Sequence, residues 1–170
     1  TPALDLSDES AFRQFQSSQE CGDACCSPGY ATLEGRLQEL SGLYRWQEKT
    51  TRLELARIIV SKAGVDLGDL LELKPLRRGP SGRLIELEIV GSQGQLRISP
   101  ELAIRKALSR THLPSSAFWI EPHGQDVTLH GMGWGHGVGL CQIGAASLAV
   151  RGWGYGQILA HYYRGTELCK

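Results

Sequence analysis

The stretch Gly131-Met-Gly-Trp-Gly-His-Gly-Val-Gly-Leu-Cys-Gln-Ile-Gly-Ala145 is the most distinctive part of this 170-residue chain. Glycine occupies every second position from 131 to 139. In an extended segment, this alternation removes the side chains from one face, so that another backbone or a ligand can lie flat against it. Glycine costs backbone entropy on folding, so such a run needs a structural or functional reason. The pattern predicts a Gly-rich strand with Trp134, His136 and Val138 on its other face.

The Gly-rich strand is expected to lead directly into a helix over residues 142–150. Backbone N–H groups at the start of a helix favour negative charge. The imidazole of His136, the thiol of Cys141 and the amide of Gln142 would then converge near these N–H groups. This composition is typical of an active or binding site. The alternative is that the glycines serve tight packing and that His136 is a hydrogen-bonded core histidine.

Cys141 raises two alternatives of its own. A cysteine at a helix start becomes a nucleophile when a histidine assists it, as in papain-like cell-wall peptidases. In those enzymes the cysteine precedes the histidine, whereas His136 precedes Cys141 here, so we expect a buried structural thiol. The second alternative is a zinc site formed by His130, His136 and Cys141, joined by the 21–26 cysteine cluster. Closed zinc sites take four ligands, and we expect no metal and no cofactor.

Composition excludes several classes of protein. Lys plus Arg number 18, as do Asp plus Glu, so no overall field attracts nucleic acid or a membrane surface. No apolar run approaches the roughly 20 residues of a membrane helix. The N-terminus lacks the basic and apolar segments of a signal peptide, which in an exported protein would lie upstream of Thr1. Arg77, Arg78 and Arg83 could form a local basic patch.

The chain is predicted to divide into an irregular N-terminal segment, residues 1–43, and an ordered part, residues 44–170. The first part has a short helix near 11–19 and a cluster of three cysteines, Cys21, Cys25 and Cys26. Together with Cys141 and Cys169 the chain has five cysteines, so at least one cannot form a disulfide within the chain. In the second, a helix capped at Thr50 or Thr51 runs to Ala63. Its apolar face is expected to comprise Leu53, Ala56, Ile59 and Val60.

Further along, strands are expected at 70–76, 83–90 and 95–98, a helix at 100–108, and a hairpin of 117–121 with 127–130. Helices are expected at 142–150 and 156–163. The fold class is therefore α+β, with antiparallel hairpins packed against several short helices and a Gly-rich strand leading into a C-terminal helical pair.

Residues 133–145 closely resemble the GHGVGMSQxGA signature of the SpoIID/LytB family. The continuation from Gly152 through Tyr155, Ile158 and His161 to Thr166 resembles the rest of that signature. Weaker upstream features occur in the same order, namely Tyr44-Arg45-Trp46, Ser81-Gly82-Arg83 and Leu113-Pro-Ser-Ser-Ala-Phe118. Over residues 44–168, the chain is thus similar to the C-terminal portion of a SpoIID/LytB domain.

The resemblance implies peptidoglycan glycan strands as the binding partner and a location outside the cytoplasm. Stage II sporulation protein D is similar to a lytic transglycosylase, and other members are amidase enhancers that assist a cell-wall amidase. The lytic reaction needs one carboxyl group as acid and then base. The family's catalytic Glu lies in an upstream helix motif that this chain lacks. Glu54 resembles it locally but follows Tyr44-Arg45-Trp46, whereas the family's Glu precedes that feature. We therefore expect Glu54 to be a solvated helix residue. The catalytic residue is therefore unknown.

The residues expected to contact the glycan come from the signature and from one upstream arginine. Aromatic rings stack on sugars, and Arg83 is either a carboxylate contact or a surface charge. The expected contacts are Trp134, Gly135, His136, Gly137, Gly139, Gln142, Gly144, Tyr162, Tyr163 and Arg83. Three hypotheses follow: part of a lytic transglycosylase, a non-catalytic amidase enhancer or wall-binding module, and a zinc- or thiol-dependent wall hydrolase.

Overall fold

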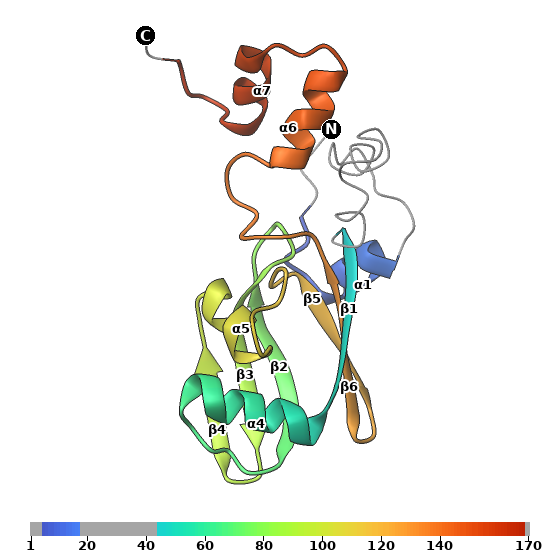
Figure 1. The fold of residues 1–170 in the computed structure, drawn as a ribbon, viewed down its shortest axis with the longest axis vertical. Helices are drawn as coiled ribbons and strands as arrows, with labels where there is room; N and C mark the ends of the chain where they lie inside the picture. The colour runs from blue at the N-terminus through green and yellow to red at the C-terminus, as the bar shows by residue number, and fades with distance from the viewer. Residues whose placement is uncertain (1–4, 18–43, 169–170) are drawn as a thin grey trace. The chain divides into compact units, whose positions relative to one another are not determined.

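The computed structural model describes residues 5–17 and 44–168 (Figure 1). The predictions for Cys21, Cys25, Cys26 and Cys169 therefore lie outside the described residues. The chain forms two compact units. The described part of the first, here the sheet unit, comprises residues 5–17 and 45–136. The described part of the second, here the helical unit, comprises Tyr44 and residues 137–168.

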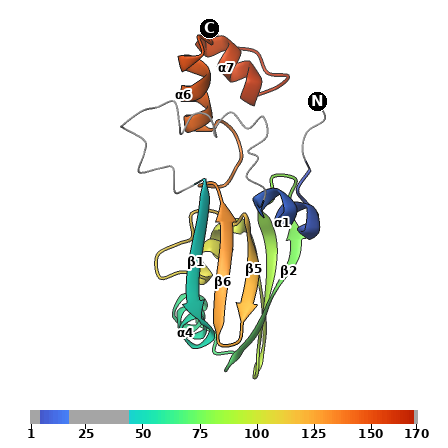
Figure 2. The same cartoon turned by 90° about the vertical axis from the view of Figure 1, so that its right-hand side faces the viewer.

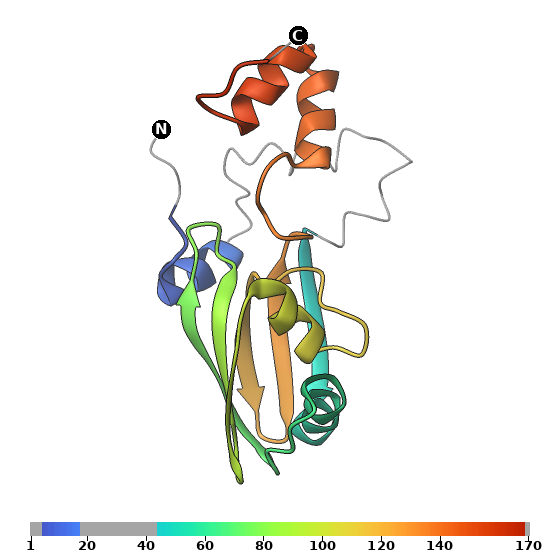
Figure 3. The same cartoon turned by 90° about the vertical axis from the view of Figure 1, so that its left-hand side faces the viewer.

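Two antiparallel three-stranded sheets organise the sheet unit, in the orders β1-β6-β5 and β2-β3-β4. Figure 2 shows β1, β6 and β5 side by side, and Figure 3 shows the helices α4 and α5 from the opposite side. The strands are β1 (Arg45–Thr51), β2 (Leu70–Arg78), β3 (Leu84–Gly91), β4 (Gly94–Ile98), β5 (Phe118–His123) and β6 (Asp126–Met132). The helices are α1 (Glu9–Ser17), α4 (Arg52–Ala63) and α5 (Glu101–Ala107) here, and α6 (Gln142–Val150) and α7 (Tyr155–Tyr162) in the helical unit.

The predicted α+β class and the predicted hairpins are confirmed. The turn at residues 123–126 joins β5 to β6, and β6 pairs with β1 in the register Thr51↔Asp126 to Arg45↔Met132. The main core joins both sheets to α4 and α5, and it includes Leu55, Leu87, Ile104, Phe118 and Leu129. Strand β6, which leads into the Gly-rich stretch, is therefore anchored by β1, β5 and the core. Among the described residues, no helix is long and apolar enough to cross a membrane.

Helix α4 begins and ends where the sequence predicts, but it buries a different face. The Thr51 hydroxyl accepts the N–H of Glu54 at 3.1 Å, and Gly64 ends the helix with a φ of 71°. The buried residues are Leu55 and Ile59, whereas Leu53 is 59% exposed. The predicted face was wrong at Leu53 and at Val60, which is 38% exposed. Leu55 and Ile59 lie one turn apart and reach the core together.

Arg78 overturns the predicted basic patch. Its side chain is 2% exposed and donates to the Glu9 carboxylate, with Nη2 at 2.5 Å, and to the Phe118 carbonyl at 2.9 Å. The guanidinium also lies over the ring of Phe12, 4.0 Å from its centre. Burial lowers the pKa of Arg78, and Glu9 opposes that shift. Arg77 pairs separately with Glu86, so these arginines serve the fold and form no joint surface.

Candidate functional site

The Gly-rich stretch starts as strand β6 and is packed against a buried tryptophan. A side chain at Gly131 would collide with the ring of Trp46, which is 8% exposed. The Trp46 indole N–H donates to the Gly133 carbonyl at 3.2 Å, and its ring lies 6.2 Å from that of Phe118. Close packing therefore explains the first glycine of the run, as the structural alternative predicted for the glycines.

Three further contacts hold the end of β6 and the start of the Gly-rich loop, residues 133–141. The Ser115 hydroxyl donates to the Met132 carbonyl at 2.7 Å. The Gly135 N–H donates to the Pro114 carbonyl at 2.8 Å, and Arg83 Nε donates to the Gly135 carbonyl at 3.0 Å. The expected substrate contact Arg83 therefore has a demonstrated role in positioning this loop.

The loop does not continue as the predicted extended strand. Gly133, Gly135, Gly137 and Gly139 all have positive φ values, between 70° and 79°. Residues with side chains rarely adopt this left-handed region. The glycine alternation therefore encodes a backbone whose φ changes sign at each step, instead of a strand with one bare face.

The two side chains at the sheet-unit end of the loop lie at the surface. Trp134 is 56% exposed, and His136 is exposed as well. The alternative that placed His136 in the core is therefore wrong. An exposed indole beside an exposed imidazole, on a backbone held by Arg83 and Pro114, suits contact with a ligand in solution.

In the helical unit, Cys141 caps the start of α6. Its Sγ accepts the N–H of Gly144 at 3.4 Å, and the residue is exposed. The expectation of a buried thiol was wrong, because a helix cap lies at the open end of the helix. Gln142, the first residue of α6, is also exposed.

Two tyrosines of the helical unit pack against glycines of the signature. A side chain at Gly144 would collide with the Tyr162 hydroxyl. The Tyr163 hydroxyl accepts the N–H of Leu140 at 3.3 Å and lies 3.2 Å from where a Cβ at Gly139 would stand. Tyr162 and Tyr163 thus have packing roles, while Tyr163 keeps 42% of its surface exposed.

The expected substrate contacts divide between the two units. Arg83, Trp134, Gly135 and His136 belong to the sheet unit, whereas Gly137, Gly139, Gln142, Gly144, Tyr162 and Tyr163 belong to the helical unit. In the sheet unit Arg83 contacts Gly135, and in the helical unit Tyr162 lies against Gly144 and Tyr163 against Gly139. That all of them line one groove stays a prediction.

His130 was a candidate zinc ligand, and its two ring nitrogens contact protein groups. Nε2 lies 2.7 Å from the Glu121 carboxylate and Nδ1 lies 3.0 Å from the Gln47 amide, while the ring stacks on Trp119 at 4.2 Å. The hydrogen bond from His130 lowers the pKa of Glu121, and His123 adds to that effect. In the parts of the chain that the structure describes, no three His, Cys, Asp or Glu side chains gather as a metal site.

Sequence reasoning missed the residues that support the loop. Trp46 is far in the chain from the neighbours Pro114 and Ser115, and each of the three binds the backbone of residues 131–135. A signal existed, since these residues lie in the upstream features that accompany the SpoIID/LytB signature. The Glu121–His130 pair followed from no motif. The β5–β6 register, which pairs Glu121 with Thr128 and Trp119 with His130, would have revealed it.

Comparison with known proteins gives one family and several partial relatives. A model of the family described as "Domain of unknown function (DUF8618)" matches residues 2–139. Among curated proteins, the amidase enhancer of Bacillus subtilis (strain 168) is 35% identical over 69 residues, 41% of this chain and 10% of the relative. Stage II sporulation protein D of Bacillus amyloliquefaciens is 38% identical over 56 residues, 33% of this chain and 16% of the relative.

A third relative, an uncharacterized protein of Brachyspira hyodysenteriae, is 39% identical over 64 residues, 38% of this chain and 17% of its own length. The chain thus matches between 10% and 17% of the length of these relatives.

Proposed function

The chain belongs to the DUF8618 family, and we propose that it binds peptidoglycan glycan strands outside the cytoplasm, as part of a SpoIID-like wall-remodelling protein. One observation carries this proposal: Trp134 and His136 are exposed on a loop whose backbone is fixed by Trp46, Pro114 and Arg83. A rigid, exposed indole can cover the apolar face of a sugar ring with little loss of conformational entropy. The names of two relatives, an amidase enhancer and a stage II sporulation protein, support the cell-wall theme.

Glycan binding by this chain requires no catalytic acid of its own. A lytic transglycosylase needs a carboxyl group with a raised pKa. Glu121, whose carboxylate contacts His130 and His123, has a lowered pKa. Glu54 forms an ion pair with Arg110 at 2.6 Å on the surface. We therefore place the catalytic Glu of the proposed transglycosylase outside this chain.

The test is binding to insoluble glycan strands whose peptides have been removed, measured as the fraction of protein that sediments. Trp134→Ala should weaken binding about tenfold, equivalent to ~1.4 kcal/mol, because the stacking surface is lost. His136→Ala should also weaken it, whereas the matched control His112→Ala, on another exposed histidine, should bind like the wild type. Unchanged binding by Trp134→Ala would refute the assignment of this surface.

Product analysis tests the missing acid separately. Incubated with the same peptide-free glycan strands, this chain should release no disaccharides that end in an anhydro sugar. Their release would show that the catalytic acid lies within the chain. The proposal that Trp134 binds glycan does not depend on that outcome.

A second function, assistance of a cell-wall amidase, is favoured by the apolar surface of the helical unit. Tyr155 is 78% exposed, Val150 57% and Trp153 40%. Exposed aromatic and aliphatic groups of this kind are typical of protein interaction sites. If the chain acts as an amidase enhancer, Tyr155→Ser should reduce stimulation of a purified wall amidase without changing sedimentation with glycan. Loss of glycan binding by this variant would contradict the separation of the two roles.

A further inference from the structure

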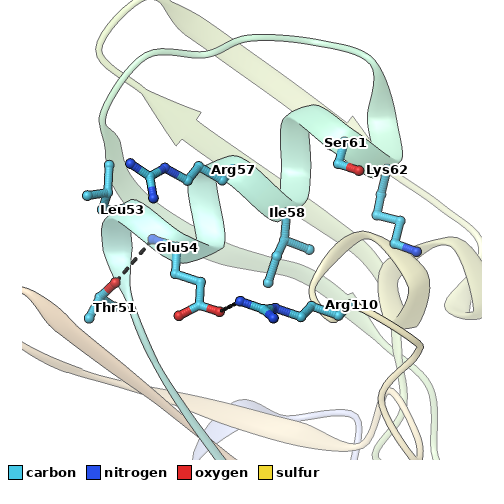
Figure 4. A pocket seen from close by; sticks show the side chains of 8 residues that line it. All are labelled: Thr51, Leu53, Glu54, Arg57, Ile58, Ser61, Lys62 and Arg110. Atoms are coloured by element: carbon cyan, nitrogen blue, oxygen red, sulfur yellow. Dashed lines mark hydrogen bonds and ion pairs between the residues drawn. The ribbon is translucent and has the colours of Figure 1, made fainter.

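A pocket of about 440 Å³ lies along the exposed side of α4 in the sheet unit (Figure 4). Its α4 side chains include Glu54, Arg57, Ile58 and Lys62, and Arg110 lies opposite them in the segment after α5. Residues three or four positions apart on a helix lie on the same side, so 54, 58 and 62 form one row. Volumes of this size accommodate small ligands.

Positive charge exceeds negative charge in this pocket. Arg110 Nη2 lies 2.6 Å from the Glu54 carboxylate, which offsets one cation. Neither Arg57 nor Lys62 has an ion-pair or hydrogen-bond partner among the described residues, and both are exposed. In a chain whose formal net charge is zero, two uncompensated cations in one pocket create a local site for anions.

The cations are spread out instead of focused on one point. Figure 4 shows Arg57 extending toward Leu53 at one end of the pocket and Lys62 at the other, with the Glu54–Arg110 pair between them. A ligand that satisfies both ends must carry two separated anionic groups. Arginine and lysine are the usual partners of carboxylates in proteins.

The remaining lining selects among anionic ligands. Glu54 brings a carboxylate into the pocket, which repels a dense polyanion such as nucleic acid and attracts an amine. Leu53 and Ile58 add apolar contact, and the hydroxyl groups of Thr51 and Ser61 line the same pocket. The matching chemistry is a zwitterion with apolar parts.

We propose that this pocket binds a short acidic peptide that carries two carboxylates and a free amine. The carboxylates contact Arg57 at one end and Lys62 at the other, and the amine contacts Glu54. This assignment uses other residues than the proposed glycan surface and does not rest on it. Peptides of this composition would make the chain sensitive to the peptide content of its surroundings.

The experiment titrates the whole chain with the synthetic tripeptide Ala-Glu-Ala, followed by backbone amide NMR. Amide signals of α4, including those of Ile58 and Ser61, should shift in a saturable manner. Arg57→Gln with Lys62→Gln should weaken binding at least about tenfold. The double variant Lys106→Gln with Arg151→Gln removes the same charge from exposed sites outside the pocket, and it should bind like the wild type.

Two modified probes test the chemistry. Amidated Ala-Gln-Ala, which lacks both carboxylates, should cause no saturable shift. Acetylated Ala-Glu-Ala should bind more weakly, because its blocked N-terminus can no longer place a positive charge against the Glu54 carboxylate. Equal binding of inorganic phosphate and the tripeptide would overturn the proposal in favour of a general anion site. Absence of shifts in α4 at millimolar tripeptide, or equal loss in the control double variant, would overturn it too. Sedimentation with glycan should be unchanged in Arg57→Gln with Lys62→Gln. The two measurements therefore test peptide binding and glycan binding separately.

Discussion

In both units a glycine makes room for an aromatic side chain, but the two units differ in the size of the core around that contact. In the sheet unit, Gly131 lies against Trp46 at the edge of a core that includes Phe118 and Leu129. In the helical unit, the buried apolar side chains of residues 137–168 are Leu148 and Ile158, and Gly144 lets α7 approach α6 through Tyr162. The sheet unit thus has a large core that a glycine completes, whereas the helical pair has little core and depends on the close approach itself.

The family match treats the two units differently. It covers residues 2–139, which include the whole described sheet unit but only Tyr44 and residues 137–139 of the described helical unit. The aromatic residues of α7 belong to the part of the chain beyond the matched residues.

The largest expected effect is at Gly131. In Gly131→Ala the new methyl group meets the buried Trp46 ring, and overpacking of this kind costs about 1–3 kcal/mol. Denaturant unfolding followed by tryptophan fluorescence would measure the loss. Gly94→Ala is the control, because its methyl group would meet only Leu67, at 3.8 Å, and the cost should stay below about 1 kcal/mol. Equal stability of the two variants would show that the Trp46 contact does not limit the sheet unit.

Gly144→Ala should break the helical pair with a smaller global effect. Alanine favours the helix by up to about 1 kcal/mol over glycine, but its methyl group collides with the Tyr162 hydroxyl. Helical-unit amides should therefore exchange faster with solvent, while sheet-unit amides keep their protection. Gly156→Ala, in α7 with only Leu168 at 4.0 Å, should instead stabilise its helix.

Removal of the Tyr162 hydroxyl supplies the second arm of this test. Tyr162→Phe combined with Gly144→Ala should recover most of the protection lost in the single variant, because the colliding atom is gone. If the double variant exchanges as fast as Gly144→Ala alone, the α6–α7 contact is not the cause.

The stability of the two units should depend differently on acid pH. The pKa of Glu121 is below its ordinary 4.5 in the folded chain, chiefly through its hydrogen bond with His130. The folded state thus binds this proton less tightly than the unfolded state, so the contribution is present above pH 4.5 and is lost as the pH falls through the lowered pKa. Glu121→Gln should flatten the acid side of the pH–stability curve. An unchanged curve would contradict the role of this pair.

The helical unit should show little of this acid dependence, because Glu167 is the only acidic side chain among its described residues. Its amide protection should therefore vary less between pH 6 and pH 3 than that of β5 and β6.

The smallest effect is expected for Cys141→Ser. Serine is a preferred helix cap, so it can replace the Sγ that accepts the Gly144 N–H, and stability should change by less than about 1 kcal/mol. Glycan binding should be retained. A complete loss of a wall-hydrolysing activity in this variant, at unchanged stability, would revive the thiol-hydrolase hypothesis.

Local patterns predicted most elements of this fold. The Thr51 cap, the Gly64 end of α4, the β5–β6 hairpin and the position of α6 all follow from short-range rules of capping, alternation and turns. Tertiary contacts decided what those rules left open. Leu53 has the right polarity for a core but lies on the wrong side of α4, and Arg78 resembles a surface residue until Glu9 and Phe12 are placed against it.

That residues 131–139 contact a ligand stays a prediction, and the backbone of this stretch could not be predicted from the sequence. The glycine alternation has a period of two, which also describes a strand. Only the φ values show that Gly133, Gly135, Gly137 and Gly139 adopt left-handed conformations. The supporting contacts from Ser115, Pro114 and Arg83 come from distant parts of the chain, and no local pattern of residue types contains that information.

Arg78 has a consequence for any shortened version of this chain. Because its buried guanidinium takes its counter-charge from Glu9 and is covered by Phe12, a fragment cut to start at Arg45 would leave a cation in an apolar interior with its partner removed, a change that costs about 3–5 kcal/mol for a buried pair. A shortened chain would avoid that cost only if the arginine were replaced as well. The stability of β2 and the presence of the N-terminal helix therefore depend on each other.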